Sequence, residues 1–207
     1  MYSKDFRNRA WNALTGRWGE AAVTALVYML IVGACSLLSA AGIGTIASLL
    51  ISGPFAVAWC IISLKILHGE SFDIKNLFDG FNNFLNTFLL YLLNYIFIFL
   101  WSLLLIVPGI IKSLSYSMSF YIMAENPEMT PSEARKESIA MMEGNKWRLF
   151  CLNFSFIGWY FLCGLTFGIL TFWVVPYVQT AMAAFYEEIK GAGETETPEA
   201  PYVDVNE

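Results

Sequence analysis

Four polar residues recur at helical spacing inside an apolar stretch. Lys112, Ser115, Tyr116 and Ser119 stand at i, i+3, i+4 and i+7, so a helix that begins at the Pro-Gly pair 108–109 carries them on one face. A lysine in a membrane helix costs about 3 kcal/mol at the bilayer centre and suggests a functional site. Two interpretations stay open: the lysine anchors the helix at the nearby water interface, or it lines a cavity or contacts an anion.

Three further polar side chains lie deep inside apolar segments. A hydrogen bond to a neighbouring helix explains an amide in such a place without any substrate. These candidates for interhelical hydrogen bonds are Asn94, Asn153 and Gln179.

The sequence lacks the motifs of the common enzyme and metal sites. His68 is the only histidine, with no second ligand or catalytic partner near it in the sequence. It also contains no phosphate-binding glycine loop and no G-x-S-x-G or H-E-x-x-H motif. We interpret the adjacent Glu187 and Glu188 as the end of the last helix. We therefore expect no enzyme activity, no metal site and no cofactor.

Composition places most of the chain in lipid. Of its 207 residues, 57% are hydrophobic and 14% are charged, against about 25% charged in soluble proteins. Three apolar blocks are each long enough for two spans of about 20 residues: residues 21–64, 80–124 and 149–186. Turn residues divide the blocks at 40–44, 107–109 and 164–168. The sequence thus predicts an all-α polytopic membrane protein with about six transmembrane helices in three hairpins.

Charge indicates the orientation of these hairpins. If each block crosses the membrane twice, all of the 12 lysines and arginines except Lys112 fall on one side. Positive residues concentrate on the cytoplasmic side of membrane proteins. Both termini are therefore expected in the cytoplasm, while the opposite turns carry no charge.

Each cytoplasmic segment also contains a short amphipathic stretch that could lie at the membrane interface. The first has Phe6, Ala10 and Leu14 on one helical face, and the second has Leu77 and Phe78 opposite charged residues. The third begins with the string "TPSE" at residues 130–133, which is typical of a capping box.

The spacing of three glycines suggests internal repetition. Gly16, Gly80 and Gly144 are each followed by an aromatic residue and are 64 residues apart. We interpret residues 1–190 as one helical membrane domain with a possible three-fold repeat, which divides into 1–64, 65–128 and 129–190. Residues 191–207 carry acids, glycine and proline with little to bury, as in a disordered acidic tail.

Several strings together resemble a bacterial family of integral membrane proteins known as domain of unknown function 975. They are "PGIIK" (108–112), "AENP" (124–127), "SIAMMEGNKWRLF" (138–150), "SFIGW" (155–159) and "TFGILTFWVVPY" (166–177). The resemblance implies a bacterial plasma-membrane location and a polytopic helical fold, with no established activity. The family is also distantly similar to the membrane domain of glycerophosphodiester phosphodiesterases, whose catalytic domain has no counterpart here.

Two functions from different classes fit these observations. The first is a non-enzymatic membrane protein that organises lipid or binds another membrane protein through its cytoplasmic amphipathic helices. The alternative is a small transporter or exporter of amphipathic solutes or peptides, with the Lys112 stripe along its path. The expected partners are the lipid bilayer and, for the first function, another membrane protein, with no nucleic acid.

Overall fold

The computed structural model describes residues 3–38 and 43–196, and within these ranges the chain is helical with no strand. The elements in chain order are α1 (Ser3–Leu14), α2 (Trp18–Leu38), α3 (Ile43–His68), the 3-10 helix η2 (Ile74–Phe81), α4 (Phe84–Leu104), α5 (Ile106–Tyr116), α6 (Ser119–Glu125), α7 (Pro131–Met141), α8 (Lys146–Phe154), α9 (Ile157–Leu165) and α10 (Thr171–Glu196).

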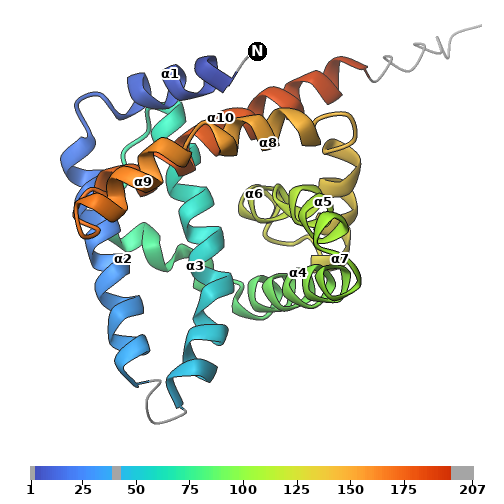
Figure 1. The fold of residues 1–207 in the computed structure, drawn as a ribbon, viewed down its shortest axis with the longest axis horizontal. Helices are drawn as coiled ribbons and strands as arrows, with labels where there is room; N and C mark the ends of the chain where they lie inside the picture. The colour runs from blue at the N-terminus through green and yellow to red at the C-terminus, as the bar shows by residue number, and fades with distance from the viewer. Residues whose placement is uncertain (1–2, 39–42, 197–207) are drawn as a thin grey trace, which may run out of the picture.

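Helices α2 and α3 run antiparallel along each other (Figure 1). Tyr28 of α2 packs edge-on against Phe55 and Trp59 of α3, with ring centroids 5.5 and 5.8 Å apart. At their charged ends, the Arg17 guanidinium donates hydrogen bonds to the carbonyls of Gly69 and Glu70 at 2.6 and 2.5 Å. The turn predicted at 40–44 lies mostly outside the described residues.

In the middle apolar block, residues 80–124, the break between the two helices lies earlier than the turn predicted at 107–109. Helix α4 ends at Leu104, and Leu105 is extended with φ −162° and ψ 143° before α5 begins. Pro108 therefore lies in the first turn of α5, where a missing backbone N–H costs nothing. Gly109 permits close packing instead of making a turn, because a Cβ there would lie 2.2 Å from Ser102 Oγ of α4.

A close approach of backbones fixes η2 against α3. A Cβ at Gly80 would lie 1.9 Å from the Pro54 carbonyl oxygen, so only glycine fits. Farther along, a Cβ at Gly53 would lie 2.4 Å from the Thr87 carbonyl oxygen at the start of α4. The second amphipathic stretch is thus packed onto the middle of α3.

The three equally spaced glycines have two different roles. Gly16 and Gly144 follow helices with φ of +86° and +76°, a conformation that glycine adopts without strain. Gly80 has no positive φ and instead makes the close contact with Pro54. The three-fold repeat stays a prediction.

Helix α10 crosses the charged ends of α2 and α3 and packs along α1 (Figure 1). Ala181 and Ala184 of α10 and Ala10 of α1 are fully buried. Small residues let two helices approach closely, and Phe6 then meets Phe185 with ring centroids 5.3 Å apart. The predicted apolar face of α1 is therefore buried against protein. Helix α10 continues to Glu196, past the expected start of the tail, and residues 197–207 lie outside the described part.

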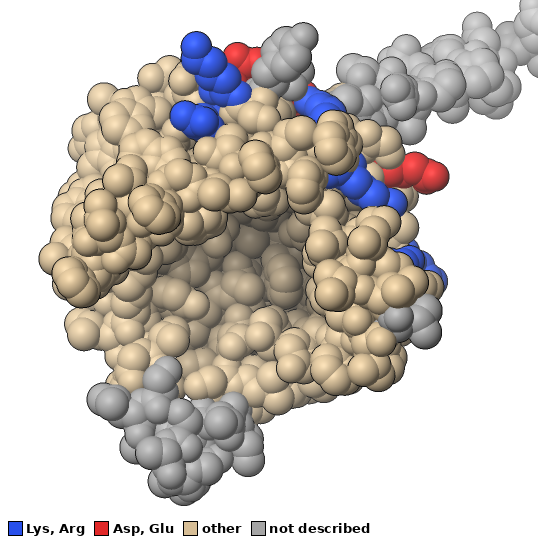
Figure 2. Space-filling model, in the orientation of Figure 1, with Lys and Arg blue, Asp and Glu red and all other residues tan. Residues whose placement is uncertain are grey.

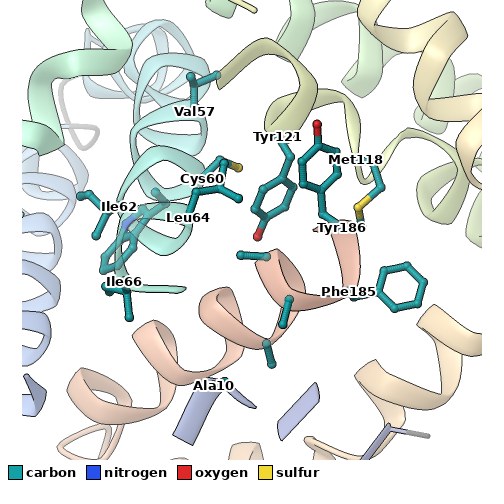
Figure 3. Packing of buried hydrophobic residues seen from close by; sticks show 14 of the residues in the cluster. Ala10, Val57, Cys60, Ile62, Leu64, Ile66, Met118, Tyr121, Phe185 and Tyr186 are labelled. Carbon is teal, nitrogen blue, oxygen red and sulfur yellow. The ribbon is translucent and has the colours of Figure 1, made fainter. Parts of the chain in front are cut away.

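The core lies where α3, α6 and α10 meet (Figure 3). Tyr121 of α6 stacks on Tyr186 of α10 with ring centroids 5.3 Å apart. Cys60 and Ile62 of α3 and Met118 are buried in the same cluster.

Four helical segments among the described residues are long and apolar enough to cross a membrane. They are Trp18–Cys35, Ser48–His68, Phe84–Leu103 and Lys146–Leu165, the last of which spans α8 and α9. In Figure 1, α4 and α5 are seen nearly along their axes, whereas α2 and α3 lie across the view. The two helix pairs therefore point in different directions, and six crossings in three hairpins stay a prediction.

Candidate functional site

The predicted polar stripe on α5 is divided between two environments. The helix ends at Tyr116, and Ser119 begins α6 after a turn. Lys112 is partly exposed, with Nζ 5.1 Å from the centroid of the Trp101 ring. Ser115 is buried and its hydroxyl donates to the Ile111 carbonyl at 2.9 Å. The four residues therefore do not share one polar surface.

Tyr116 instead faces an arginine from α7. The Arg135 guanidinium lies 4.7 Å from the Tyr116 ring centroid and 4.1 Å from that of Phe97 in α4. A guanidinium over an aromatic face is attracted by the ring's quadrupole, so Arg135 links three helices. The sequence around Arg135 is charged, so the contact of Arg135 with Phe97 in the middle of the apolar helix α4 could not be predicted from it.

Two of the three amides make contacts between helices. Asn94 is 4% exposed and its Nδ2 donates to Ser119 Oγ at 2.9 Å, which links α4 to α6. Gln179 of α10 accepts from the Tyr121 hydroxyl at 3.2 Å through its backbone carbonyl and at 3.3 Å through Oε1. Asn153 bonds within its own helix, where Nδ2 donates to the Leu149 carbonyl at 3.2 Å.

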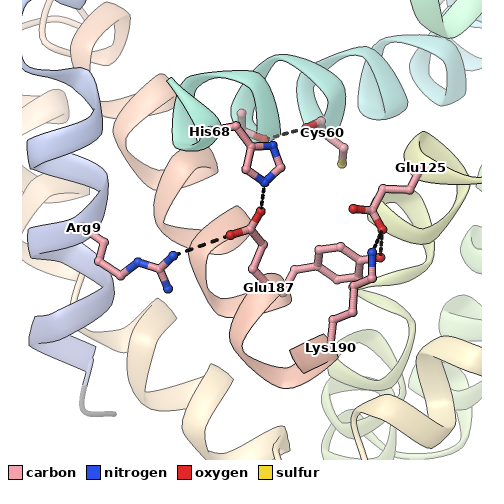
Figure 4. A network of polar contacts seen from close by, with 8 residues as sticks. Arg9, Cys60, His68, Glu125, Glu187 and Lys190 are labelled. Atoms are coloured by element: carbon pink, nitrogen blue, oxygen red, sulfur yellow. Dashed lines mark hydrogen bonds and ion pairs between the residues drawn. The ribbon is translucent and has the colours of Figure 1, made fainter. Parts of the chain in front are cut away.

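Three glutamates pair with side chains from several helices, and Figure 4 shows the contacts of Glu125 and Glu187. We name Glu125, Glu187 and Glu188 the glutamate cluster. Glu187 pairs with His68 of α3 and lies 3.5 Å from Arg9 of α1.

The other two glutamates pair with different side chains. Glu188 of α10 pairs with Arg148 of α8. Glu125 of α6 accepts from the Tyr186 hydroxyl at 2.6 Å and from Lys190 Nζ at 2.7 Å. Glu187 and Glu188 were predicted to mark the end of the last helix, but α10 continues to Glu196, and both side chains pair with residues of other helices.

The ion pairs of the glutamate cluster hold helices in position but contribute little to the free energy of unfolding. Its side chains are partly exposed, between 22% for Glu187 and 48% for His68. An ion pair in contact with water is worth about 0–1 kcal/mol, although networks of fixed geometry contribute more. No group of three or more histidine, cysteine, aspartate or glutamate residues that could hold a metal ion occurs among the described residues.

In Figure 2, the lysines and arginines lie along the top and right edges of the face shown. By contrast, the corner between α4 and α5 and the helix α9 expose large apolar side chains. Leu103 and Ile106 are each 75% exposed. Exposed apolar surface of this extent marks contact with a membrane or another protein.

The described residues form only helices, and four of their segments are long and apolar enough to span a membrane, which is compatible with a membrane protein. The model of a protein family of unknown function, DUF975, matches residues 1–115 and 103–193. The chain therefore belongs to this family, and the match includes the N-terminal third, whose motifs are less distinctive. Comparison with curated proteins and with solved structures gave no match. The similarity to glycerophosphodiester phosphodiesterases stays a prediction.

Proposed function

We propose that this chain is a non-enzymatic integral protein of the bacterial plasma membrane that organises lipid or binds another membrane protein. The observation that carries the proposal is the separation of two surfaces. Apolar side chains are exposed on α4 around Leu103 and on α9, whereas the glutamate cluster fixes the charged ends of α1, α3 and α8 to α10. One surface suits acyl chains and the other suits headgroups and water.

Exposed aromatic residues beside the charged elements support contact with the membrane interface. Trp147 at the start of α8 is 72% exposed, and Trp11 of α1 and Phe78 of η2 are also exposed. Tryptophan and phenylalanine at the headgroup level, beside basic residues such as Lys4 and Lys146, would hold anionic lipids. The buried residues Phe6 and Leu77 maintain the fold instead.

A lipid-restriction experiment tests this function. The protein and the triple variant Trp11→Ser, Phe78→Ser and Trp147→Ser are reconstituted into vesicles that contain spin-labelled phosphatidylglycerol. We expect the wild type to immobilise a larger fraction of this lipid than the variant. Glu128→Ser, which replaces an exposed polar side chain in the connection between α6 and α7, is the control. An equal immobilised fraction in the wild type and the triple variant would refute the proposal.

A second candidate function is the export of small amphipathic solutes. An uncharged hollow bounded by α3, α6 and α10 favours this function. The Lys112 stripe does not favour it, because its four residues do not share one polar surface. If the protein exports a solute through this hollow, Ala56→Leu, which fills it, should reduce flux and Lys112→Ala should not. If Lys112→Ala reduces flux and Ala56→Leu does not, the transport path follows the Lys112 stripe instead of the hollow.

A further inference from the structure

Two cations from different helices lie over aromatic rings of α4. Lys112 Nζ of α5 lies 5.1 Å from the centroid of the Trp101 ring. The Arg135 guanidinium of α7 lies 4.1 Å from the centroid of the Phe97 ring. Helix α7 packs against both α4 and α5 (Figure 1), so Arg135 reaches this pair of apolar helices.

The two cations are about one helical turn apart. Phe97 and Trp101 are at i and i+4 on α4, and residues with this spacing have Cβ atoms about 5–6 Å apart. The same spacing holds on α5, because Arg135 also lies 4.7 Å from the ring centroid of Tyr116, four residues after Lys112. Phosphate oxygens accept charge-assisted hydrogen bonds of about 2.7–2.9 Å, so one phosphate group can bridge an ammonium and a guanidinium at this separation.

Neither cation has a carboxylate partner within the part of the chain that the structure describes. Glu133, two residues before Arg135, instead accepts from the Thr130 hydroxyl at 2.6 Å. Both cationic side chains are partly exposed, so an anion can reach the Lys112 ammonium and the outer nitrogens of the guanidinium. Like charges one turn apart repel each other, and an anion between them would remove this repulsion.

We infer that Lys112 and Arg135 together bind one phosphate group, which a membrane phospholipid supplies. The inference rests on the proposed lipid-organising function and names the part of the lipid that is held. Arginine binds phosphate through two parallel donors and lysine binds it as a point charge. Leu100 and Leu103, close to Trp101 on α4, are 53% and 75% exposed and suit the acyl chains of the same lipid.

Protection of the two side chains from chemical modification tests the inference. The full-length protein in a nonionic detergent is treated with a water-soluble acylating reagent, which modifies lysine, or with phenylglyoxal, which modifies arginine. Peptide mass spectrometry measures the rate at each residue. We expect phosphatidylglycerol to slow the modification of Lys112 and Arg135 together, whereas dioleoylglycerol, which lacks the phosphate, should not. Lys136, an exposed cation next to Arg135 in the sequence, should react at the same rate with either lipid.

Removal of one cation tests whether the two act on the same phosphate group. In Arg135→Gln, the phosphatidylglycerol concentration that half-protects Lys112 should rise roughly 10- to 100-fold, because a charge-assisted contact is lost. Arg135→Lys keeps the charge and should give an intermediate value. Lys136→Gln is the matched control and should leave the concentration unchanged. The comparison of lipids on the wild type decides the test even if Arg135→Gln does not fold.

Several results would overturn the assignment. Equal protection by dioleoylglycerol would show that a lipid covers Lys112 without recognition of its phosphate, and unchanged protection in Arg135→Gln would refute the shared site. Protection by inorganic phosphate at the same concentrations as phosphatidylglycerol would replace the lipid with a soluble anion. If the wild type immobilises spin-labelled phosphatidylglycerol more than the triple tryptophan and phenylalanine variant does, but Lys112 is not protected, only this site is refuted. If both measurements fail, the lipid-organising function is refuted as well.

Discussion

Replacement of Gly80 by alanine tests the packing of η2 on α3. The added Cβ would lie 1.9 Å from the Pro54 carbonyl oxygen, whereas optimal heavy-atom contacts are at about 3.5 Å. Either backbone must therefore move by more than about 1 Å. Overpacking a core typically costs about 1–3 kcal/mol, and Gly80→Ala should reach at least the upper end because both atoms belong to rigid helical segments.

The assay is thermal unfolding of the detergent-solubilised protein, followed by helical circular dichroism. For a chain of this size, about 3 kcal/mol corresponds to a fall in Tm of roughly 6–12 °C. Gly158→Ala is the matched control, because it lies within α9 and nothing comes within 4 Å of its added Cβ. Alanine favours a helix by about 0.5–1 kcal/mol over glycine, so the control should unfold at the same or a slightly higher temperature. Equal Tm values for the two variants would refute the proposed packing.

Three further substitutions test the capping box, the glutamate cluster and the polar contact between α4 and α6. Thr130→Ala should lower the unfolding free energy by about 1 kcal/mol in denaturant titrations; no change would refute the cap. Hydrogen bonds from the Thr130 side chain and backbone lower the pKa of Glu133 below its usual 4.5. The stabilisation that the ionised Glu133 carboxylate contributes is therefore present above pH 4.5 and is lost as pH falls through the folded pKa. Glu187→Gln keeps the side-chain shape but removes the charge, and should increase amide hydrogen exchange in α1; unchanged protection would contradict its role in holding that helix. Asn94→Ala should destabilise by only about 0.6 kcal/mol, the average for polar contacts within membranes, and a loss above 2 kcal/mol would show that Asn94 does more than bond Ser119.

Local chemistry was predictable where a short motif determines the result. The string "TPSE" forms the expected capping box: Thr130 accepts from the Glu133 backbone N–H at 3.4 Å, and Glu133 Oε2 accepts from the Thr130 backbone N–H at 3.0 Å. The all-helical fold and its long apolar helices also follow from composition, because a helix satisfies its own backbone hydrogen bonds in lipid.

Contacts between distant segments could not be predicted in this way. Gly109 has the sequence context of a turn, but its position opposite Ser102 makes it a packing residue in a helix. The pairing of His68 with Glu187 joins residues that are far apart in sequence. A single sequence defines which side chains are polar, and only the tertiary arrangement determines which polar groups meet.

The central proposal is that the apolar helices lie in the bacterial plasma membrane with the charged elements in the cytoplasm. Single cysteines at Gly42, Ile106 and Phe167, in a cysteine-free background, test it with a membrane-impermeant thiol reagent. Ile106 and Phe167 are exposed and tolerate the change, whereas Gly109 does not. A cysteine at the exposed Lys136 is the cytoplasmic control. We predict that cysteines at all three positions react with the reagent added to intact cells, whereas the cysteine at position 136 reacts only after lysis. Reaction of the three positions from the cytoplasmic side alone would contradict the proposal.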